Sequence, residues 1–365
     1  MSRSIEDLLG VRTRRAATGP APTFSFLFFS DVRRDVSTAQ KYQFMRDITL
    51  FADREGFSAV YIPERHFNEF GAIYANSAVV AAYLIPDTKR VRFRTAGVSL
   101  PLHHPAEVVE WWAMNDVLSN GRVDLGFGSG WSKADFILAP ANYATRREIC
   151  ADLIPVVQRL WRGEAVAFPG PEGESVSVRV YPRPIQPELN VWLLATQNDA
   201  AFVQAGARGY NVFTMLYGFD FAALARKIEL YRNARQEAGH DGATGIVSLM
   251  LHTFVHPDAT LVRRAVEQPL KEYIRTSLSQ HLAASLTRSA AAPGDVDEAQ
   301  ILDYAFERYF CTSGIFGPPE LASRIVDEAL GAGVNDIACL VDFGVQYPLV
   351  MESLRHLKTL VERYQ

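Results

Sequence analysis

The segment VYIPERHFNEFGAI, residues 60–73, combines the two features that decide how this chain is interpreted. It opens with an apolar run that is typical of a buried β-strand. The run passes through a proline directly into an acid, a guanidinium and an imidazole, which are Glu64, Arg65 and His66. Three such groups at the end of a buried strand indicate a fold that gathers strand ends around a pocket.

The rest of the chain repeats this apolar run, and a helical pattern follows most of the copies. The runs are TFSFLFF (23–29), FSAVYI (57–62), VRFRTAGVSL (91–100), RVDLGFG (122–128), NVWLLAT (190–196), YNVFTML (210–216), IVSLMLHTFV (246–255) and NDIACLVDF (335–343). Runs that are apolar throughout are expected of parallel strands covered on both faces. About eight such units predict an α/β fold, the (β/α)8 TIM barrel. An open doubly wound sheet is disfavoured, because the first strand ends in FFSDVRRD without a glycine fingerprint.

Helix signals and breaks in the alternation complete the predicted organisation. STAQKYQFMRDITLFADREG (37–56) predicts a helix that starts after Ser30 or Ser37 and closes on Gly56. Residues 164–189 are rich in proline and glycine and predict a hairpin insertion before the fifth strand. Residues 280–300, after the seventh strand, predict either a mobile lid over the barrel mouth or a solvated linker. We expect a flexible segment over 1–22 and a single domain over 23–365.

Composition excludes several classes of function. The chain has 365 residues, 48% of them apolar, and a formal net charge of -4, so nucleic acid is not an expected partner. Its three cysteines lie far apart without CxxC spacing, which indicates neither a disulfide framework nor a zinc site. The sequence has neither a signal-peptide pattern nor a membrane-spanning run, so we expect a cytoplasmic protein with no membrane partner.

The third predicted strand ends in a small-residue bulge and a histidine pair. Ala96 and Gly97 interrupt the strand pattern, which indicates a bulge or a close approach by a flat ligand. His103 and His104 follow, but adjacent histidines point to different sides and no carboxylate pattern accompanies them. We therefore predict no metal site.

The fourth and fifth predicted strands end in groups suited to an anion. The glycines of LGFGSGW (125–131) leave backbone amides open to an anion or a ring edge, although GxGxxG is not completed. Thr196, Gln197 and Asn198 open a helix whose N-terminal amides can hold a phosphate. The alternative is a plain helix cap. At the second strand the corresponding alternative is a structural ion pair between Glu64 and Arg65, with His66 capping the next helix.

ERHFNEFG (64–71), followed by RTAGVSLPLHHPAEVVEWWAMNDVLSNGRVDLGFGSGW (94–131), resembles the bacterial luciferase-like flavin-dependent monooxygenase superfamily. Two later segments, 249–280 and 303–320, resemble its natural-product biosynthesis branch, the mupirocin-type members found with polyketide and nonribosomal peptide synthetases. The resemblance implies a barrel, reduced FMN (FMNH2) delivered by a separate flavin reductase, and dioxygen as co-substrate. It also matches a homodimer formed through the early helices, where Val108, Trp111, Trp112 and Leu118 offer apolar surface.

Carried onto this chain, the resemblance places His66 as the second histidine of the luciferase motif and Arg65 where luciferase has its first. An arginine stays protonated and cannot act as a base at neutral pH. Arg65 is therefore expected to stabilise an anion or to grip a substrate carboxylate or phosphate, and His66 to transfer protons. The implied catalytic residues are His66, Arg65 and Glu64.

The same resemblance assigns the cofactor. The implied cofactor-binding residues are Ala96, Gly97, Gly128, Ser129, Gly130, Thr196, Gln197 and Asn198. Gly128 and Ser129 stand where luciferase has a cysteine and an arginine, so the flavin phosphate is expected on Ser129, nearby amides and the 196–198 turn. The bond between Ala96 and Gly97 is expected to be a non-proline cis peptide against the flavin ring. Phenylalanines and a tryptophan are expected to line the mouth, namely Phe26, Phe28, Phe67, Phe70, Phe127 and Trp131.

These implications lead to one hypothesis and two alternatives. The hypothesis is an FMN-dependent monooxygenase that hydroxylates a natural-product intermediate, or inserts oxygen in a Baeyer–Villiger manner, as a step in antibiotic biosynthesis. The intermediate is either a small molecule or a thioester on a carrier protein. The first alternative is a deazaflavin-dependent hydride-transfer oxidoreductase on the same barrel. The second is a non-catalytic flavin-binding subunit.

Overall fold

The computed structural model describes residues 21–29, 33–71, 73–285 and 298–365. Eight parallel strands form a closed barrel in the order β12, β1, β2, β3, β5, β8, β9, β10, and β10 pairs with both β9 and β12. They are β1 (Thr23–Leu27), β2 (Ala59–Ile62), β3 (Arg92–Thr95), β5 (Val123–Gly128), β8 (Val191–Leu194), β9 (Asn211–Met215), β10 (Val247–Val255) and β12 (Asp336–Leu340). Each lies within one of the eight predicted runs, so the predicted (β/α)8 barrel is confirmed.

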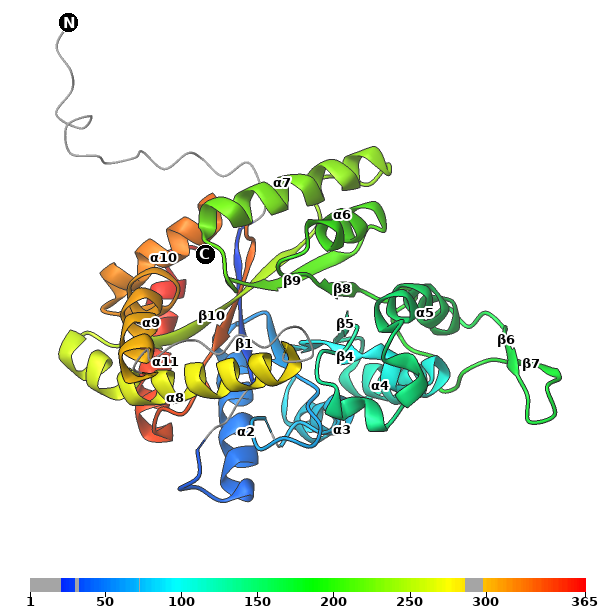
Figure 1. The fold of residues 1–365 in the computed structure, drawn as a ribbon, viewed down its shortest axis with the longest axis horizontal. Coiled ribbons are helices and arrows are strands. Elements are labelled where there is room, and N and C mark those ends of the chain that lie inside the picture. Colours follow the sequence, from blue (N-terminus) through cyan, green and yellow to red (C-terminus); the bar gives the residue numbers. More distant parts are fainter. Residues whose placement is uncertain (1–20, 30–32, 72, 286–297) are drawn as a thin grey trace, which may run out of the picture.

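Helices surround the barrel (Figure 1). They are α2 (Thr38–Glu55), α3 (Ser77–Leu84), α4 (Pro105–Ser119), α5 (Arg146–Trp161), α6 (Asp199–Ala207), α7 (Phe221–Glu237), α8 (Ala259–Ser285), α9 (Glu298–Thr312), α10 (Pro319–Gly331) and α11 (Tyr347–Val361). The start of α2 is a capping box, in which the Ser37 hydroxyl accepts from the Gln40 backbone N–H and the Gln40 side chain accepts from the Ser37 backbone. Gly56 ends the helix at φ 80°, in the left-handed region that favours glycine. Of the two predicted start signals, Ser37 is therefore the correct one.

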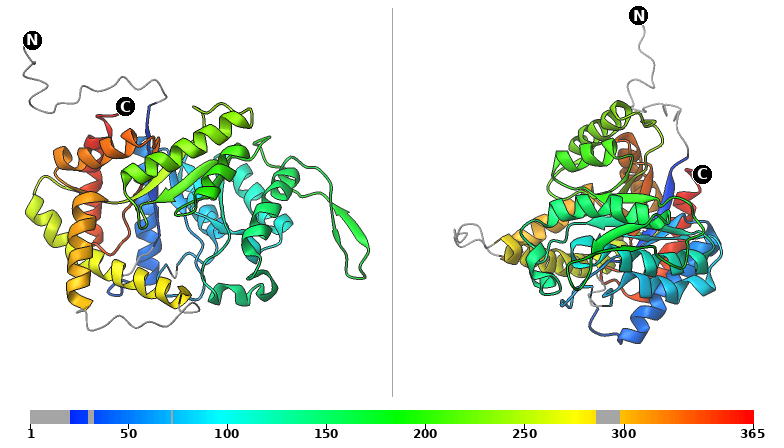
Figure 2. Two further views of the ribbon diagram at one scale, coloured as in Figure 1. Left: turned by 45° about the horizontal axis from the view of Figure 1, so that its top comes forward. Right: turned by 90° about the vertical axis from the view of Figure 1, so that its right-hand side faces the viewer.

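Short strands decorate the barrel. The predicted hairpin is confirmed as the antiparallel pair β6 (Val166–Pro169) and β7 (Ser175–Val178), which projects away from the barrel beyond α5 (Figures 1 and 2). β4 (Val98–Ser99) pairs with the end of β5. β11 (Ile315–Gly317), which was not predicted, pairs with the end of β10.

Two predicted segments fall largely outside the described residues. The predicted loop over 280–300 is helical as far as Ser285 and again from Glu298, and the residues between lie outside the description. Nearly all of the predicted N-terminal segment, 1–22, lies outside it as well. Among the described helices, none combines the length and apolarity that a membrane crossing requires.

A buried polar layer fills the barrel below its mouth. The Arg94 guanidinium pairs with Asp124 at 2.9 Å and with Asp336 at 3.2 Å, and it stacks on the Trp192 ring at 3.9 Å. The Tyr61 hydroxyl donates to Asp336 at 2.7 Å. Every barrel strand contributes a residue to this layer, and these are Ser25, Tyr61, Arg94, Asp124, Trp192, Phe213, Ser248 and Asp336. A ligand must therefore bind above this layer, at the strand ends.

Candidate active site

Glu64 lies between two imidazoles just beyond the end of β2. Its Oε1 accepts hydrogen bonds from His66 Nε2 at 3.2 Å and from His103 Nε2 at 3.0 Å. Only 5% of the Glu64 side chain is exposed. The alternative of an ion pair between Glu64 and Arg65 is wrong, because the Glu64 carboxylate pairs with two histidines. The expected cap is wrong as well, since α3 is capped by Asn76 and not by His66. Glu64 thus joins the residues that follow β2 to those that follow β4.

The electrostatics of this array favour a protonated imidazole. The hydrogen bond to Glu64 raises the pKa of His66, against the opposing effect of burial. Burial by itself would raise the pKa of Glu64, but hydrogen bonds from His103 and His66 outweigh it, so the pKa is lowered. Because the carboxylate stays ionised, His66 can hold a proton at higher pH than a free histidine.

Arg65 points away from Glu64 into a box of aromatic rings. The centre of its guanidinium lies 4.0 Å from the Phe29 ring, and 5.4 Å from the rings of Phe70 and Trp131. Among the described residues, none forms a hydrogen bond or ion pair with this guanidinium, although Arg65 is only 9% exposed. Burial lowers the pKa of Arg65 to about 10, which still leaves it charged at neutral pH.

Asp135 is an acidic residue near Glu64, Arg65 and His66 that the sequence did not predict. It lies in the 3-10 turn η3 (Ala134–Ile137), beyond the glycine-rich end of β5, and is only 7% exposed. Its Oδ1 has no hydrogen-bond partner among the described residues, and burial raises its pKa. The charges of His66 and Arg65 act on it in the opposite direction. Nothing local in the sequence SKADF marks this residue, because only the fold brings it to β2.

The bulge at the end of β3 lies beside this trio. The Ala96 backbone N–H donates to the Ile62 carbonyl at 2.9 Å, which joins the two strand ends. The expected cis peptide between Ala96 and Gly97 is wrong, since Tyr181–Pro182 is the cis bond recorded among the described residues. The bulge forms instead through a φ of +135° at Gly97, where a Cβ would meet Leu194 at 2.6 Å. Gly97 therefore presents only backbone at the bulge, and the Leu194 side chain packs close beside it.

The ends of β5 and β8 offer groups for a phosphate. Ser129 and Thr196 are half-buried, and their hydroxyls have no hydrogen-bond partner among the described residues. Asn198 caps α6 by accepting from the Ala200 N–H at 3.1 Å, which is the plain-cap alternative of the prediction. Lys227, which was not predicted, donates to the Gln197 carbonyl at 2.7 Å and forms an ion pair with Asp199 beside this turn.

Within the described ranges, two groups of side chains have the composition of a metal site. Ligand atoms of Glu64, His66 and His103 lie within 4.8 Å of one another, so His103 does have a carboxylate nearby, one supplied by a different strand. Both imidazoles already direct Nε2 at that carboxylate, and a metal would have to displace those protons. The second group is His256, Glu352 and His356. There the Asp258 N–H donates to His256 Nδ1 at 3.1 Å, which leaves the ring proton on Nε2, toward Glu352.

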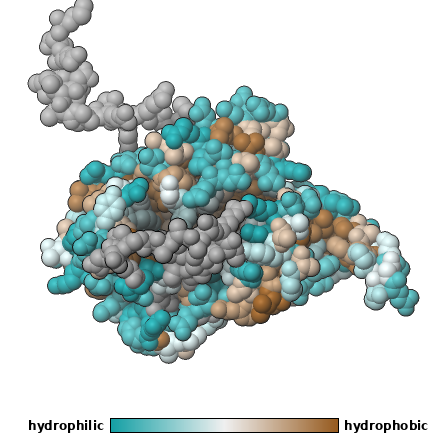
Figure 3. Space-filling model, viewed as in Figure 1, coloured by the Kyte–Doolittle hydropathy of each residue, from teal (hydrophilic) through white to brown (hydrophobic). Residues whose placement is uncertain are grey.

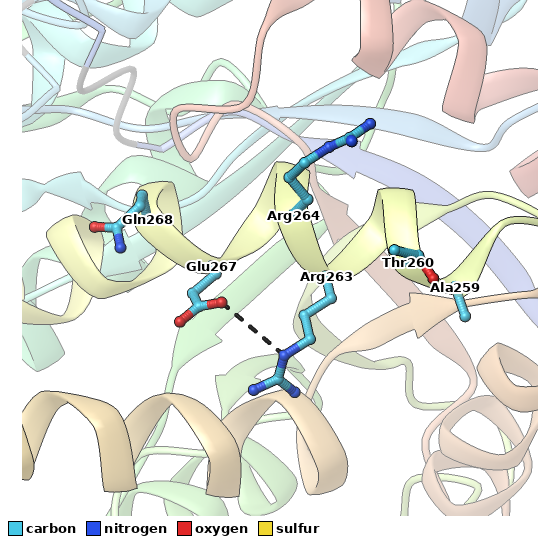
Figure 4. A pocket seen from close by; sticks show the side chains of 6 residues that line it. All are labelled: Ala259, Thr260, Arg263, Arg264, Glu267 and Gln268. Carbon is cyan, nitrogen blue, oxygen red and sulfur yellow. Dashed lines mark ion pairs between the residues drawn. The ribbon is translucent and has the colours of Figure 1, made fainter.

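The aromatic lining of the mouth differs from the prediction. Phe26, Phe28 and Phe127 are fully buried in the core. Phe67 is 62% exposed and Trp131 is 38% exposed, so these two can face a ligand. A separate groove on α8 is lined by none of the predicted site residues (Figure 4). Its lining residues are Ala259, Thr260, Arg263, Arg264, Glu267 and Gln268.

Known proteins resemble this chain in sequence and in fold. The profile of a family described as luciferase-like monooxygenase matches residues 23–335. The oxygenase component of a flavin-dependent trigonelline monooxygenase from Acinetobacter baylyi is 26% identical over 234 residues, 63% of this chain and 64% of that protein. The match thus spans less than two thirds of the relative's own length.

Solved structures extend the likeness over nearly the whole chain. The monooxygenase RslO1 from Streptomyces bottropensis superposes with a TM-score of 0.80 at 21% identity, covering 94% of this chain and all of the other. An F420-dependent secondary alcohol dehydrogenase with an F420–acetone adduct gives 0.71 at 15% identity, covering 94% and 99%. At such identities these likenesses concern the fold.

Proposed function

Since this chain belongs to the luciferase-like monooxygenase family, we propose that it is an oxidoreductase that uses reduced FMN and dioxygen to oxygenate an organic substrate. The observation that carries the proposal is the array of His66, Glu64 and His103 beside the bulge at Gly97, a residue that adds no side chain of its own. A proton donor next to a flat binding surface is what flavin-dependent oxygenation requires.

The residues present fit a bound flavin. The ring would lie against the backbone of Ala96 and Gly97, beside the Leu194 side chain. The phosphate would be held by the Ser129 and Thr196 hydroxyls, because the Ala200 and Ala201 amides of α6 already bond to Asn198. When bound, the reduced flavin supplies two electrons to dioxygen, so that one oxygen atom enters the substrate and the other leaves as water.

The protein's own part is to hold protons and to exclude water. His66 keeps a proton that Glu64 stabilises, and it can deliver that proton to a neighbouring oxygen atom. Phe67 and Trp131 shield the mouth, which keeps bulk water from competing for that proton.

The test is oxygen transfer from labelled dioxygen. Purified protein with reduced FMN, ¹⁸O₂ and a panel of ketones, aromatic acids and acyl thioesters should give product that is heavier by one labelled oxygen. His66→Ala should abolish incorporation while FMN binding remains. His356→Ala, on the α11 surface, is the matched control. If no member of the panel gains the label, the proposal fails.

A second candidate is hydride transfer with a deazaflavin. The fold likeness to the F420-dependent dehydrogenase favours it, because both cofactors present a flat ring and a phosphate. Titrating FMN and F420 separately against tryptophan fluorescence distinguishes the two, since the true cofactor should bind more tightly.

We also propose the substrate class and the partners. The substrate is a natural-product intermediate, free or carried as a thioester, and a separate reductase supplies the flavin. The support is the resemblance of residues 249–280 and 303–320 to the biosynthetic branch. Comparing free acids with carrier-bound thioesters in the labelling assay tests the form of delivery.

A homodimer is the proposed assembly. Val108 and Trp112 are buried within their own chain, so they are not the contact face. Exposed apolar residues of α3 and α4 support the proposal, and apolar surface gathers on that side in Figure 3. They are Val79, Tyr83, Met114, Val117 and Leu118, each at least 42% exposed. Leu118→Glu should shift the mass in analytical ultracentrifugation from two chains to one.

A further inference from the structure

We propose that Arg65 and Tyr273 form a recognition site for a carboxylate group of the substrate. This inference rests on the proposed function and specifies what the substrate carries. It assigns Arg65 to substrate binding. A cation at this position could instead bind the phosphate of the cofactor or an anion derived from dioxygen.

The first support is that Arg65 is a buried cation without a protein counter-ion. It is 9% exposed, and within the described part of the chain it forms neither an ion pair nor a side-chain hydrogen bond. The nearby acids are Asp135 and Asp342, and neither forms an ion pair with it. Asp342 instead accepts from the Phe29 backbone N–H at 2.9 Å and from the Tyr74 hydroxyl at 2.7 Å. An unpaired buried charge is costly, so an anionic ligand would relieve that cost.

The second support is the way in which aromatic rings surround the guanidinium. Three rings surround the guanidinium, and they are those of Phe29 at 4.0 Å and of Phe70 and Trp131 at 5.4 Å. These rings have no oxygen atom that could accept its hydrogen bonds. The stem of Arg65 packs closely on Gly71, where an added Cβ would lie 2.9 Å from Arg65 Cγ. The N–H donors thus remain available in a preorganised fork, which matches a planar carboxylate.

The third support is the hydroxyl of Tyr273, on α8. Its ring lies between Phe70 at 5.5 Å and His252 at 4.4 Å, and the same Phe70 ring lies 5.4 Å from the Arg65 guanidinium. Among the described residues, none hydrogen-bonds to this hydroxyl. A carboxylate that receives the Arg65 fork can therefore also accept from Tyr273. The groups suited to the flavin phosphate lie at the ends of β5 and β8, which leaves this position to the substrate.

The test compares phenylacetate with its neutral amide, phenylacetamide, by isothermal titration calorimetry of the full chain. The wild-type protein should bind the acid at least ten-fold more tightly than the amide. Arg65→Met keeps an apolar stem and should remove this preference, and Arg65→Lys should retain part of it. Tyr273→Phe should weaken acid binding several-fold. Arg263→Met is the matched control, because Arg263 also stacks on a ring, that of Phe306 on α9, but pairs with Glu307.

Three outcomes would overturn the assignment. Equal wild-type affinity for acid and amide is the first, and an unchanged preference in Arg65→Met is the second. The third is a loss of FMN affinity in Arg65→Met as large as the loss for phenylacetate, which would place the cofactor phosphate here. Thermal melting checks that each variant is folded. If Arg65→Met does not fold, Arg65→Lys still tests the assignment. Failure of the proposed function appears separately, as missing ¹⁸O incorporation despite an intact acid preference.

Discussion

Replacing Glu64 with glutamine should lower the pKa of His66 and destabilise the protein within a defined range of pH. Glutamine keeps the size of the side chain and one acceptor oxygen but loses the charge. Hydrogen bonds to charged groups contribute about 1.5 to 3 kcal/mol each, and neutral ones about 0.5 to 1.5 kcal/mol. Glu64 makes two such bonds and is only 5% exposed, so we expect a loss of about 2 kcal/mol in the free energy of unfolding.

The pH dependence of this loss follows from the two pKa shifts. Folding raises the pKa of His66, so its contribution is complete below the ordinary value of 6.5 and is lost as pH rises through the folded value. Folding lowers the pKa of Glu64, so its contribution is complete above the ordinary value of 4.5 and is lost as pH falls through the folded value. The difference between wild type and Glu64→Gln should therefore be largest between pH 4.5 and 6.5.

Two measurements check this prediction. Urea unfolding at a series of pH values gives the difference in free energy, and NMR titration of the imidazole carbon-bound protons gives the pKa of His66. Glu352→Gln, at an exposed carboxylate near His256, is the matched control. A difference that does not vary with pH, or an unchanged pKa of His66 in Glu64→Gln, would refute the reasoning.

Three further changes probe the barrel. Arg94→Met leaves the buried Asp336 carboxylate without a cation and Asp124 with Arg92 alone, and it should cost about 3 to 5 kcal/mol in urea unfolding. Exposed Arg179→Met should cost less than about 0.5 kcal/mol, and equal costs would contradict this. Gly97→Ala puts a Cβ at 2.6 Å from Leu194 and should weaken FMN binding in a fluorescence titration, and unchanged affinity would argue against a ring at the bulge. Burial lowers the pKa of His252 to about 3, so this residue destabilises the fold as pH falls below 6.5. His252→Phe should make the melting temperature less sensitive to acid in that range, and an unchanged slope would refute this.

The barrel was predictable because its strands are long apolar runs separated by helix caps and glycines. The same approach missed β11, since three residues, Ile315–Gly317, are too few to establish a period. It also missed β4 as a separate strand, because the bulge at Gly97 divides one continuous apolar run.

The site was predictable in its parts but not in its pairing. Glu64 and His103 were each interpreted from the residues next to them in the sequence. Their hydrogen bond was not predicted, because it joins positions 39 residues apart. Asp135 and Tyr273 carry no local signal and reach the mouth only through the fold. The cis peptide at Ala96–Gly97 was expected only from the family resemblance. The bulge forms without it, because Gly97 can adopt a φ of 135°.

The polar layer around Arg94 also limits how the chain can misfold. Side chains alternate between the two faces of a strand, so sliding β3 by a single residue would swing this guanidinium out among the helices. Asp124 and Asp336 would then lie buried inside the barrel without this cation between them. A barrel with this shifted register would be much less stable than the native one. The Arg94 side chain therefore helps to select a single register for β3.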